Sequence, residues 1–275
     1  MSLLASVLIL VAAAGVAIGA LLLVRRGAPE GSYFSDGDRA SGVFGVLATG
    51  FAIFAGFVVF LAFTSYDQSR SGAEREALTV VQQFETAQFL PASVRERLGG
   101  ELVCYGRSVV HGEWPEMKSG NAGDAINPWG LALFRTLQPF EPTGAAEEAA
   151  FSKWLDQTSE REEARRDRIH GASGIIPTSV WIVLFLVAAV VFAYMLFFAD
   201  SGERALSQAM LIGSATTVLV VTLLAIHALD SPYGAAVGSI EPAAMERSLT
   251  LLDEIRTALG ATGPLPCDEA GVASG

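Results

Sequence analysis

Charged side chains are scarce in this sequence. They make up 17% of the 275 residues, whereas 51% are hydrophobic, and most of the charge is confined to one central block and the chain ends. This distribution indicates a membrane protein, because long uncharged stretches remain for the bilayer. The formal net charge of −11 argues against a nucleic-acid partner, which would favour a basic surface.

Histidine and cysteine, the usual carriers of metal and redox chemistry, are also scarce. The three histidines, His111, His170 and His227, lie in three different segments and show no metal-ligand spacing. Cys104 and Cys267 are far apart and have no redox spacing. Both are expected on the same side of the membrane, where a disulfide is feasible but not expected. No nucleophile motif, phosphate loop or dinucleotide fingerprint is found, so we expect no enzyme, cofactor or metal.

Four apolar segments are long enough to cross a bilayer. Each has 22 to 24 residues, which corresponds to roughly 33–36 Å of helix and slightly exceeds the hydrocarbon thickness. The first is not read as a secretory signal, since Arg25 and Arg26 follow it where a cleavage site would lie. The four predicted spans are Leu3–Val24, Val43–Thr64, Ile175–Phe198 and Leu206–Leu229.

These spans divide the chain into four parts. We expect a first transmembrane hairpin (1–64), a helical extramembrane block (65–174), a second hairpin (175–229) and a C-terminal turn, helix and flexible tail (230–275). Apolar residues recur at three- and four-residue steps in the polar regions, and no run alternates with period two. The fold class predicted is therefore all-α, with further helices at Tyr66–Leu90, Ala92–Glu113, Ala145–Ile169 and Pro242–Leu259. Because no turn residue precedes Gly72, the second span is expected to continue into the block as one helix.

Three arginines, Arg161, Arg165 and Arg168, fall on one face of the last helix of the block. The favoured interpretation is a solvated helix with intrahelical ion pairs such as Glu162 with Arg166. The alternative is a basic stripe near the membrane that gathers anions or lipid head groups, although interspersed acids would cancel much of its field.

Small residues form a seam along the second span. They follow the three- and four-residue steps of a packed face, whereas five phenylalanines at three-residue steps wind around the helix. Small seams let helices approach closely in lipid. Ordinary bundle packing and a role around a central pore remain equally open. The seam consists of Gly45, Ala48, Ala52, Ala55, Val59 and Ala62.

The fourth span ends at an unusual turn, "LDSPYG". Pro232 cannot continue a helix and pushes Ser231 to extended geometry, so the helix must end at Asp230. The helix dipole disfavours an acid there, so we expect Asp230 to pair with an arginine of the block or with His227. We interpret the turn, Asp230, Pro232, Tyr233 and Gly234, as structural.

This exit and the polar exit of the second span, "FTSYDQSR", resemble bestrophins, the anion channels of animals and their bacterial relatives. The segments "EREAL", "FLPASVRERL", "YGRSVVHGEWPEM", "IIPTSVWIVL" and "LDSPYGAAVGSIEP" are similar, in this order, to an uncharacterised bacterial family described as bestrophin-like. The resemblance implies two transmembrane hairpins around a helical block and a ring-shaped homo-oligomer, in bestrophins a pentamer, with the second helix at its centre. Membrane lipids and small ions are the other expected partners.

Two departures from bestrophins affect the predicted function. Calcium-responsive bestrophins carry an acidic run after the turn, where this chain has Ala235, Ala236, Val237 and Gly238, so no calcium clasp is expected. The bestrophin neck uses bulky apolar residues at four-residue steps. The corresponding pore-lining candidates here are Ala52, Gly56, Phe60 and, at the exit, Thr64. Among the counterparts of the neck, only Phe60 is bulky.

Two functions are compatible with these features. The first is an oligomeric channel of bestrophin type, passing small anions through the inner (plasma) membrane. The second is a non-conducting membrane scaffold or sensor whose helical block binds a partner protein. The arginines of the short loops, Arg25, Arg26, Arg39 and Arg204, favour a block outside the cytoplasm by the positive-inside rule. The resemblance implies a cytoplasmic block, and we follow it here.

Overall fold

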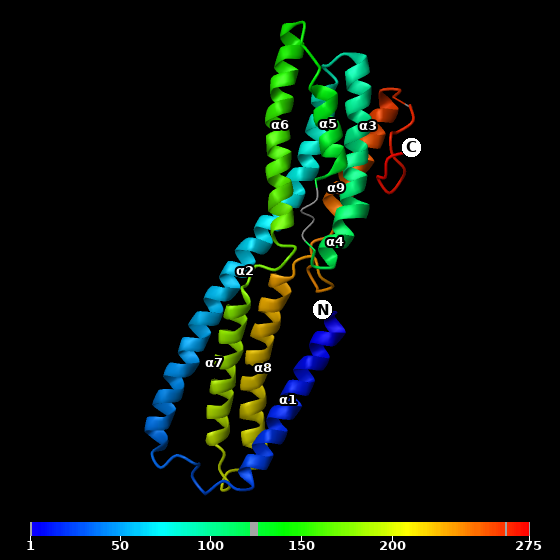
Figure 1. Ribbon diagram of the computed structural model, residues 1–275. Coiled ribbons are helices and arrows are strands. Elements are labelled where there is room, and N and C mark those ends of the chain that lie inside the picture. Colours follow the sequence, from blue (N-terminus) through cyan, green and yellow to red (C-terminus); the bar gives the residue numbers. More distant parts are fainter. Residues whose placement is uncertain (1, 122–125, 262, 275) are drawn as a thin grey trace. The chain divides into compact units, whose positions relative to one another are not determined.

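The computed structural model describes residues 2–121, 126–261 and 263–274. Within these ranges the regular elements are all helices, and the one β-type pairing is an isolated bridge between Cys267 and Ala273. The predicted all-α fold with four apolar membrane-span candidates is confirmed (Figure 1). Two compact units are present, and each is described by itself.

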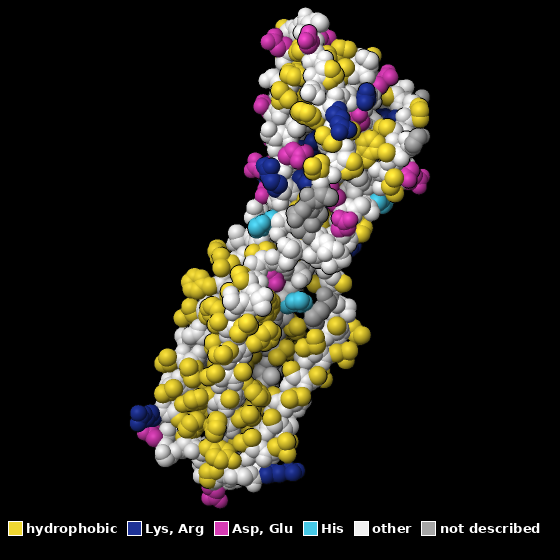
Figure 2. All heavy atoms as spheres, in the orientation of Figure 1, with side chains coloured by type: hydrophobic (Ala, Val, Ile, Leu, Met, Phe, Trp, Pro, Cys, Tyr) yellow, Lys and Arg dark blue, Asp and Glu magenta, His cyan; other side chains and the backbone are white. Residues whose placement is uncertain are grey.

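The first unit contains the membrane helices. It comprises the chain up to Thr64, Gly174–Asp230 and Ala235–Val237. Its helices are long and apolar enough to cross a membrane, and the most apolar window of each is only 11–22% buried. On the face of this unit that Figure 2 shows, hydrophobic side chains predominate. Its helices are α1 (Leu3–Arg25), the first part of α2 (Gly37–Ala87), α7 (Thr178–Phe197) and α8 (Ala205–Asp230).

The two short connections of the membrane unit are bound to each other. Arg25 donates hydrogen bonds from Nε to the Asp200 carbonyl at 3.0 Å and from Nη2 to the Ser201 carbonyl at 3.1 Å. The Asp200 carboxylate accepts from the backbone amides of Gly31 and Gly202, and these bonds lower its pKa. The α1–α2 and α7–α8 connections therefore form one interlocked end.

Helix α2 is continuous from Gly37 to Ala87, as the missing turn residue predicted. Its second part belongs to the second unit, which comprises Ser65–Ser173, Ser231–Gly234 and Gly238–Gly275. The other helices of this unit are α3 (Ala92–Ser108), the π-helix η1 (Val109–Glu113), α4 (Trp114–Lys118), α5 (Pro128–Leu137), α6 (Ala145–His170) and α9 (Ala243–Ala258).

A close crossing of α2 and α6 organises the second unit. A Cβ atom on Gly72 would lie 2.6 Å from the Arg168 amide nitrogen and 2.8 Å from the Ala164 carbonyl oxygen. Only glycine, which has no Cβ atom, lets the backbone of α6 approach α2 this closely. The crossing brings α6 onto a core that includes Val80, Phe84, Leu98, Leu102, Tyr105, Trp114 and Trp154.

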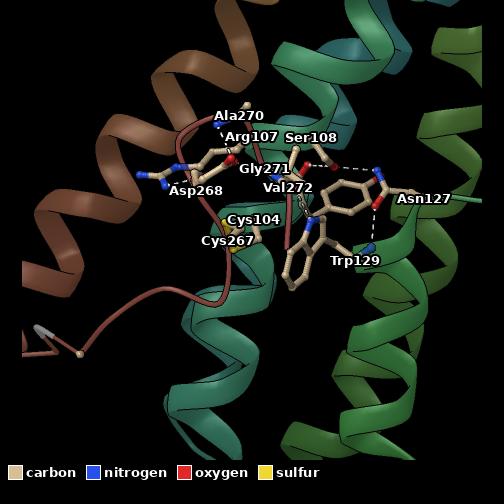
Figure 3. The surroundings of a disulfide bond; sticks show 12 residues. Cys104, Arg107, Ser108, Asn127, Trp129, Cys267, Asp268, Ala270, Gly271 and Val272 are labelled. Carbon is tan, nitrogen blue, oxygen red and sulfur yellow. Dashed lines mark hydrogen bonds between the residues drawn. A yellow bond between two sulfur atoms is a disulfide. The ribbon is translucent and has the colours of Figure 1, made fainter. Parts of the chain in front are cut away.

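Cys104 and Cys267 form a disulfide, so the expectation that they remain unpaired was wrong (Figure 3). The reason is that the segment after α9 turns back onto α3, which brings the two Cα atoms to 5.8 Å, within bonding range. Two hydrogen bonds hold this segment, one from Arg107 to the Asp268 carbonyl and one from the Trp129 indole to the Gly271 carbonyl. The C-terminal segment, expected to be flexible, is thus fastened at several points.

Candidate functional site

The pore-lining candidates share one exposed stripe of α2. Ala52, Gly56, Phe60 and Thr64 are all exposed, and 66% of Phe60 is accessible. The Thr64 hydroxyl donates to the Phe60 carbonyl at 2.9 Å, so this polar side chain at the helix exit is satisfied within α2 itself.

The opposite side of α2 packs inside the membrane unit. Phe51, Ala55 and Val58 belong to a core cluster with Leu184, Val191 and Ile226 of α7 and α8, and Ala62 is fully buried. Because each residue turns the helix by about 100°, Phe60 lies roughly 180° from the centre of this buried face.

The small-residue seam is only partly buried within the chain. Ala55 and Ala62 are buried within the chain, whereas Gly45 and Ala52 are exposed. The seam spans an arc of roughly 100° on the helix, with one edge on the buried face and the other near the exposed stripe. Its buried members therefore serve packing within the chain, and its exposed members join the surface stripe.

Asp230, at the end of α8, has different partners from those expected. Its Oδ1 accepts hydrogen bonds from the amides of Ile175 and Ile176 at 2.7 and 2.8 Å, and its Oδ2 accepts one from the Trp181 indole at 3.2 Å. The prediction of an arginine or His227 as its partner was wrong. The carboxylate instead satisfies backbone donors just before α7, as a helix cap does, and so joins the end of α8 to the start of α7.

The turn that follows fastens the chain within the second unit. The Tyr233 hydroxyl donates to the Arg168 carbonyl at 2.5 Å, and its ring meets Trp114 edge-on at 5.6 Å. Burial raises the pKa of Tyr233 well above its usual value, so the hydroxyl stays protonated and remains a donor. The Gly234 amide closes the turn on the Ser231 carbonyl at 3.0 Å. These contacts support the structural interpretation of the turn.

A buried ionic cluster lies in the second unit, and the sequence did not predict it. Arg168 is fully buried and binds both carboxylate oxygens of Glu76 as well as Glu113, the latter at 2.6 Å. The Tyr105 hydroxyl donates to Glu76 at 2.6 Å, and Arg165 pairs with Glu113 at 3.1 Å. The helix that carries these arginines is therefore not the solvated helix expected. Arg161 and Arg168 point into the core, 1% and 0% exposed.

The electrostatics of the cluster keep Glu113 charged and Tyr105 neutral. Burial alone would raise the pKa of Glu113, but Arg168 and Arg165 outweigh it and hold that pKa below its usual value. Burial and the neighbouring Glu76 carboxylate raise the pKa of Tyr105, so its hydroxyl stays protonated. Two carboxylates face two guanidinium groups, an arrangement that supports folding.

Metal-binding geometry is not found in the described ranges, where no group of three or more His, Cys, Asp or Glu side chains converges. His111 and His170 belong to η1 and α6, and the ring of His227 on α8 lies 6.3 Å from that of Trp181.

This architecture is similar to that of known proteins, both in sequence pattern and in fold. A sequence model of the Bestrophin-like domain matches residues 11–245. Crystal structures of two variants of a bacterial bestrophin homologue from Klebsiella pneumoniae superimpose on the chain. One has a TM-score of 0.68 at 14% identity, over 88% of this chain and 99% of that one. The other has a TM-score of 0.65 at 16% identity, over 91% and 98%. At these identities the likeness concerns the fold. No curated protein matches the chain.

Proposed function

The chain belongs to the bestrophin-like family, and from this premise we propose that it forms an oligomeric ion channel in the plasma membrane, with α2 lining the pore. The resemblance to bestrophins supports a pentamer and small anions as the permeating species. No catalytic role is proposed, since the sequence carries no nucleophile motif, phosphate loop or dinucleotide fingerprint.

The observation that carries this proposal is the exposed stripe of α2. The helix buries one face against α7 and α8, and the opposite face, centred on Phe60, is exposed in the part of the chain that the structure describes. In a membrane such a face meets lipid, another subunit or a lumen. In a ring of subunits whose second helices surround the axis, as the family resemblance implies, this face points toward the axis.

Phe60 is proposed as the constriction of this pore. The stripe is small at Ala52 and Gly56 and becomes bulky at Phe60, one turn before the hydroxyl of Thr64. A ring of phenylalanines repels water, and a dewetted apolar ring blocks ions without a moving lid.

The test is ion flux through liposomes that contain the purified chain. Phe60→Ala is expected to raise anion flux because it widens and wets the constriction, while the oligomer mass in detergent stays unchanged. The matched control is Phe185→Ala, which removes another exposed phenylalanine, 56% accessible, from α7. It is expected to leave the flux at the wild-type level.

Equal flux from wild type and Phe60→Ala would place the gate elsewhere. A monomeric or dimeric native mass would remove the pore altogether and favour the scaffold or sensor function. Reversal potentials under a chloride gradient test the small-anion part separately from conduction itself.

A further inference from the structure

We propose that the second unit, with its C-terminal segment, lies on the extracytoplasmic side of the membrane, where Cys104 and Cys267 are oxidised to a structural disulfide. This orientation is opposite to the one that the bestrophin resemblance implies. It concerns the placement of the chain and does not depend on whether the chain conducts ions.

The disulfide is the first observation. Cys104 is 0% and Cys267 5% exposed, and the bond joins α3 to the C-terminal segment. Disulfides form and persist in oxidising compartments, whereas cytosolic thiol systems keep cysteines reduced. A buried structural disulfide therefore indicates that this unit folds outside the cytoplasm.

The surroundings of the bond show a site built for it (Figure 3). Asp268 accepts hydrogen bonds from the amides of Ala270 and Val272 and shapes the chain into a tight turn after Cys267. Gly271, at φ +79°, lies against the backbone of Ser108, where any side chain would collide. This segment is docked by its own contacts, and the cysteines are held together by the fold rather than by a chance encounter.

The charge distribution is the second, independent observation. Four arginines flank or lie on the α1–α2 and α7–α8 connections. Arg25 ends α1 and Arg26 follows it, Arg39 lies near the start of α2, and Arg204 lies on the α7–α8 connection. Both connections are short, and short positively charged connections favour the cytoplasmic side. With four spans, cytoplasmic connections place the second unit on the opposite side of the membrane.

The arginines of the second unit do not outweigh the orientation signal from the positively charged short connections. The stretch 65–173 far exceeds the ~60-residue limit beyond which segments are translocated largely regardless of charge. Five of its arginines also have ion-pair or hydrogen-bond partners on the same unit: Arg70 with Glu74, Arg75 with Asp167, Arg161 with Gln83, Arg165 with Glu113, and Arg168 with Glu76.

The oxidation needs an electron acceptor, which an exported thiol–disulfide exchange protein supplies. The two thiols of Cys104 and Cys267 lose two protons and two electrons and form the S–S bond. The disulfide of the exchange protein takes up those electrons and protons and becomes a dithiol.

The first experiment uses the wild-type chain in growing cells. Free thiols are trapped with acid, and the denatured chain is treated with a polyethylene-glycol maleimide, with and without prior reduction. We expect no gel shift without reduction and a double shift after it. A double shift without reduction would show that the cysteines are thiols in the cell and would overturn the disulfide part of the proposal.

The second experiment reads the orientation from reporter cysteines added to the wild-type chain, whose own thiols are paired. Thr250→Cys lies on an exposed position of α9, and Ser201→Cys lies on the exposed α7–α8 connection. A membrane-impermeant sulfonated maleimide is expected to label Thr250→Cys in intact cells and Ser201→Cys only after lysis. The reverse pattern would overturn the orientation. If neither variant folds, the thiol state of the wild-type chain still decides between an oxidising and a reducing compartment.

Discussion

The guanidinium group of Arg168 is a fully buried charge in the second unit. Arg168 has no exposed surface, and its charge is balanced by Glu76 and Glu113 from two other helices, with its guanidinium 5.4 Å from the Trp114 ring centre. Burying a charge without a partner is far more costly than losing a surface ion pair. Removing either carboxylate would leave part of the buried Arg168 charge uncompensated, and this cost is the main reason why both carboxylates are needed for stability.

Glu76→Gln is expected to destabilise the chain by about 3–5 kcal/mol, because it leaves Arg168 short of one negative charge in the core. The measurement is thermal or denaturant unfolding of the full chain in detergent. Arg70→Gln, which breaks the exposed Arg70–Glu74 pair, is the control and is expected to cost under about 0.5 kcal/mol. Similar losses of stability in both variants would show that the buried pair contributes no more than the exposed one.

Acidification should weaken the same cluster. The pKa of Glu113 is held below its usual value of 4.5 by Arg168 and Arg165, so the unfolded chain takes up this proton before the folded one does. The contribution of Glu113 is complete above about pH 4.5 and is lost as the pH falls through its lower folded value. We expect the melting temperature of wild type to fall below pH 4.5 more steeply than that of Glu113→Gln. Parallel curves for the two proteins would contradict this assignment.

At the scale of elements, the α2–α6 crossing depends on one missing side chain. Gly72→Ala would place a Cβ atom 2.6–2.8 Å from backbone atoms of α6, and backbone cannot yield as a side-chain end can. We expect destabilisation of about 1–3 kcal/mol, measured by unfolding of the full chain. Gly112→Ala on η1 has no neighbour within 4 Å and serves as the control. An unchanged melting temperature for Gly72→Ala would show that the two helices separate at little cost.

Helices and spans were predictable because their signals are local. The predicted first span, Leu3–Val24, differs from α1 by one residue at its end, and the predicted helix Ala145–Ile169 also differs by one residue from α6. Length, hydropathy and proline positions decide such boundaries without knowledge of the fold. Helix α2 begins at Gly37, before the predicted span Val43–Thr64, in polar sequence that hydropathy does not report.

Partners distant in sequence were not predictable in the same way. The Asp230 contacts, the Arg168–Glu76 pair and the disulfide each join residues at least 49 positions apart. The sequence does contain one local signal for the buried ion pair. Glu76 stands next to Ala77 within the apolar stripe of α2, and an acid at a buried position requires a buried cation. Arg168 then becomes a candidate partner.

For the whole molecule, we predict that channel activity and stability do not respond to calcium. The turn is followed by Ala235, Ala236, Val237 and Gly238, which offer no carboxylate to a cation that needs six to eight oxygen ligands. Flux and melting temperature are measured during a titration with micromolar calcium, and magnesium serves as the control for ionic strength. A calcium-specific change in either quantity would reveal a site elsewhere in the chain.

The Cys104–Cys267 bond also sets an order on biosynthesis. Its partners are 163 positions apart, and the covalent ring that it closes contains both α7 and α8. At typical synthesis rates Cys267 emerges roughly 8–33 s after Cys104. During that time Cys104 waits as a thiol while two more spans are inserted. The bond therefore forms only after α7 and α8 have been synthesised, and a chain that stops before Cys267 keeps Cys104 as a free thiol.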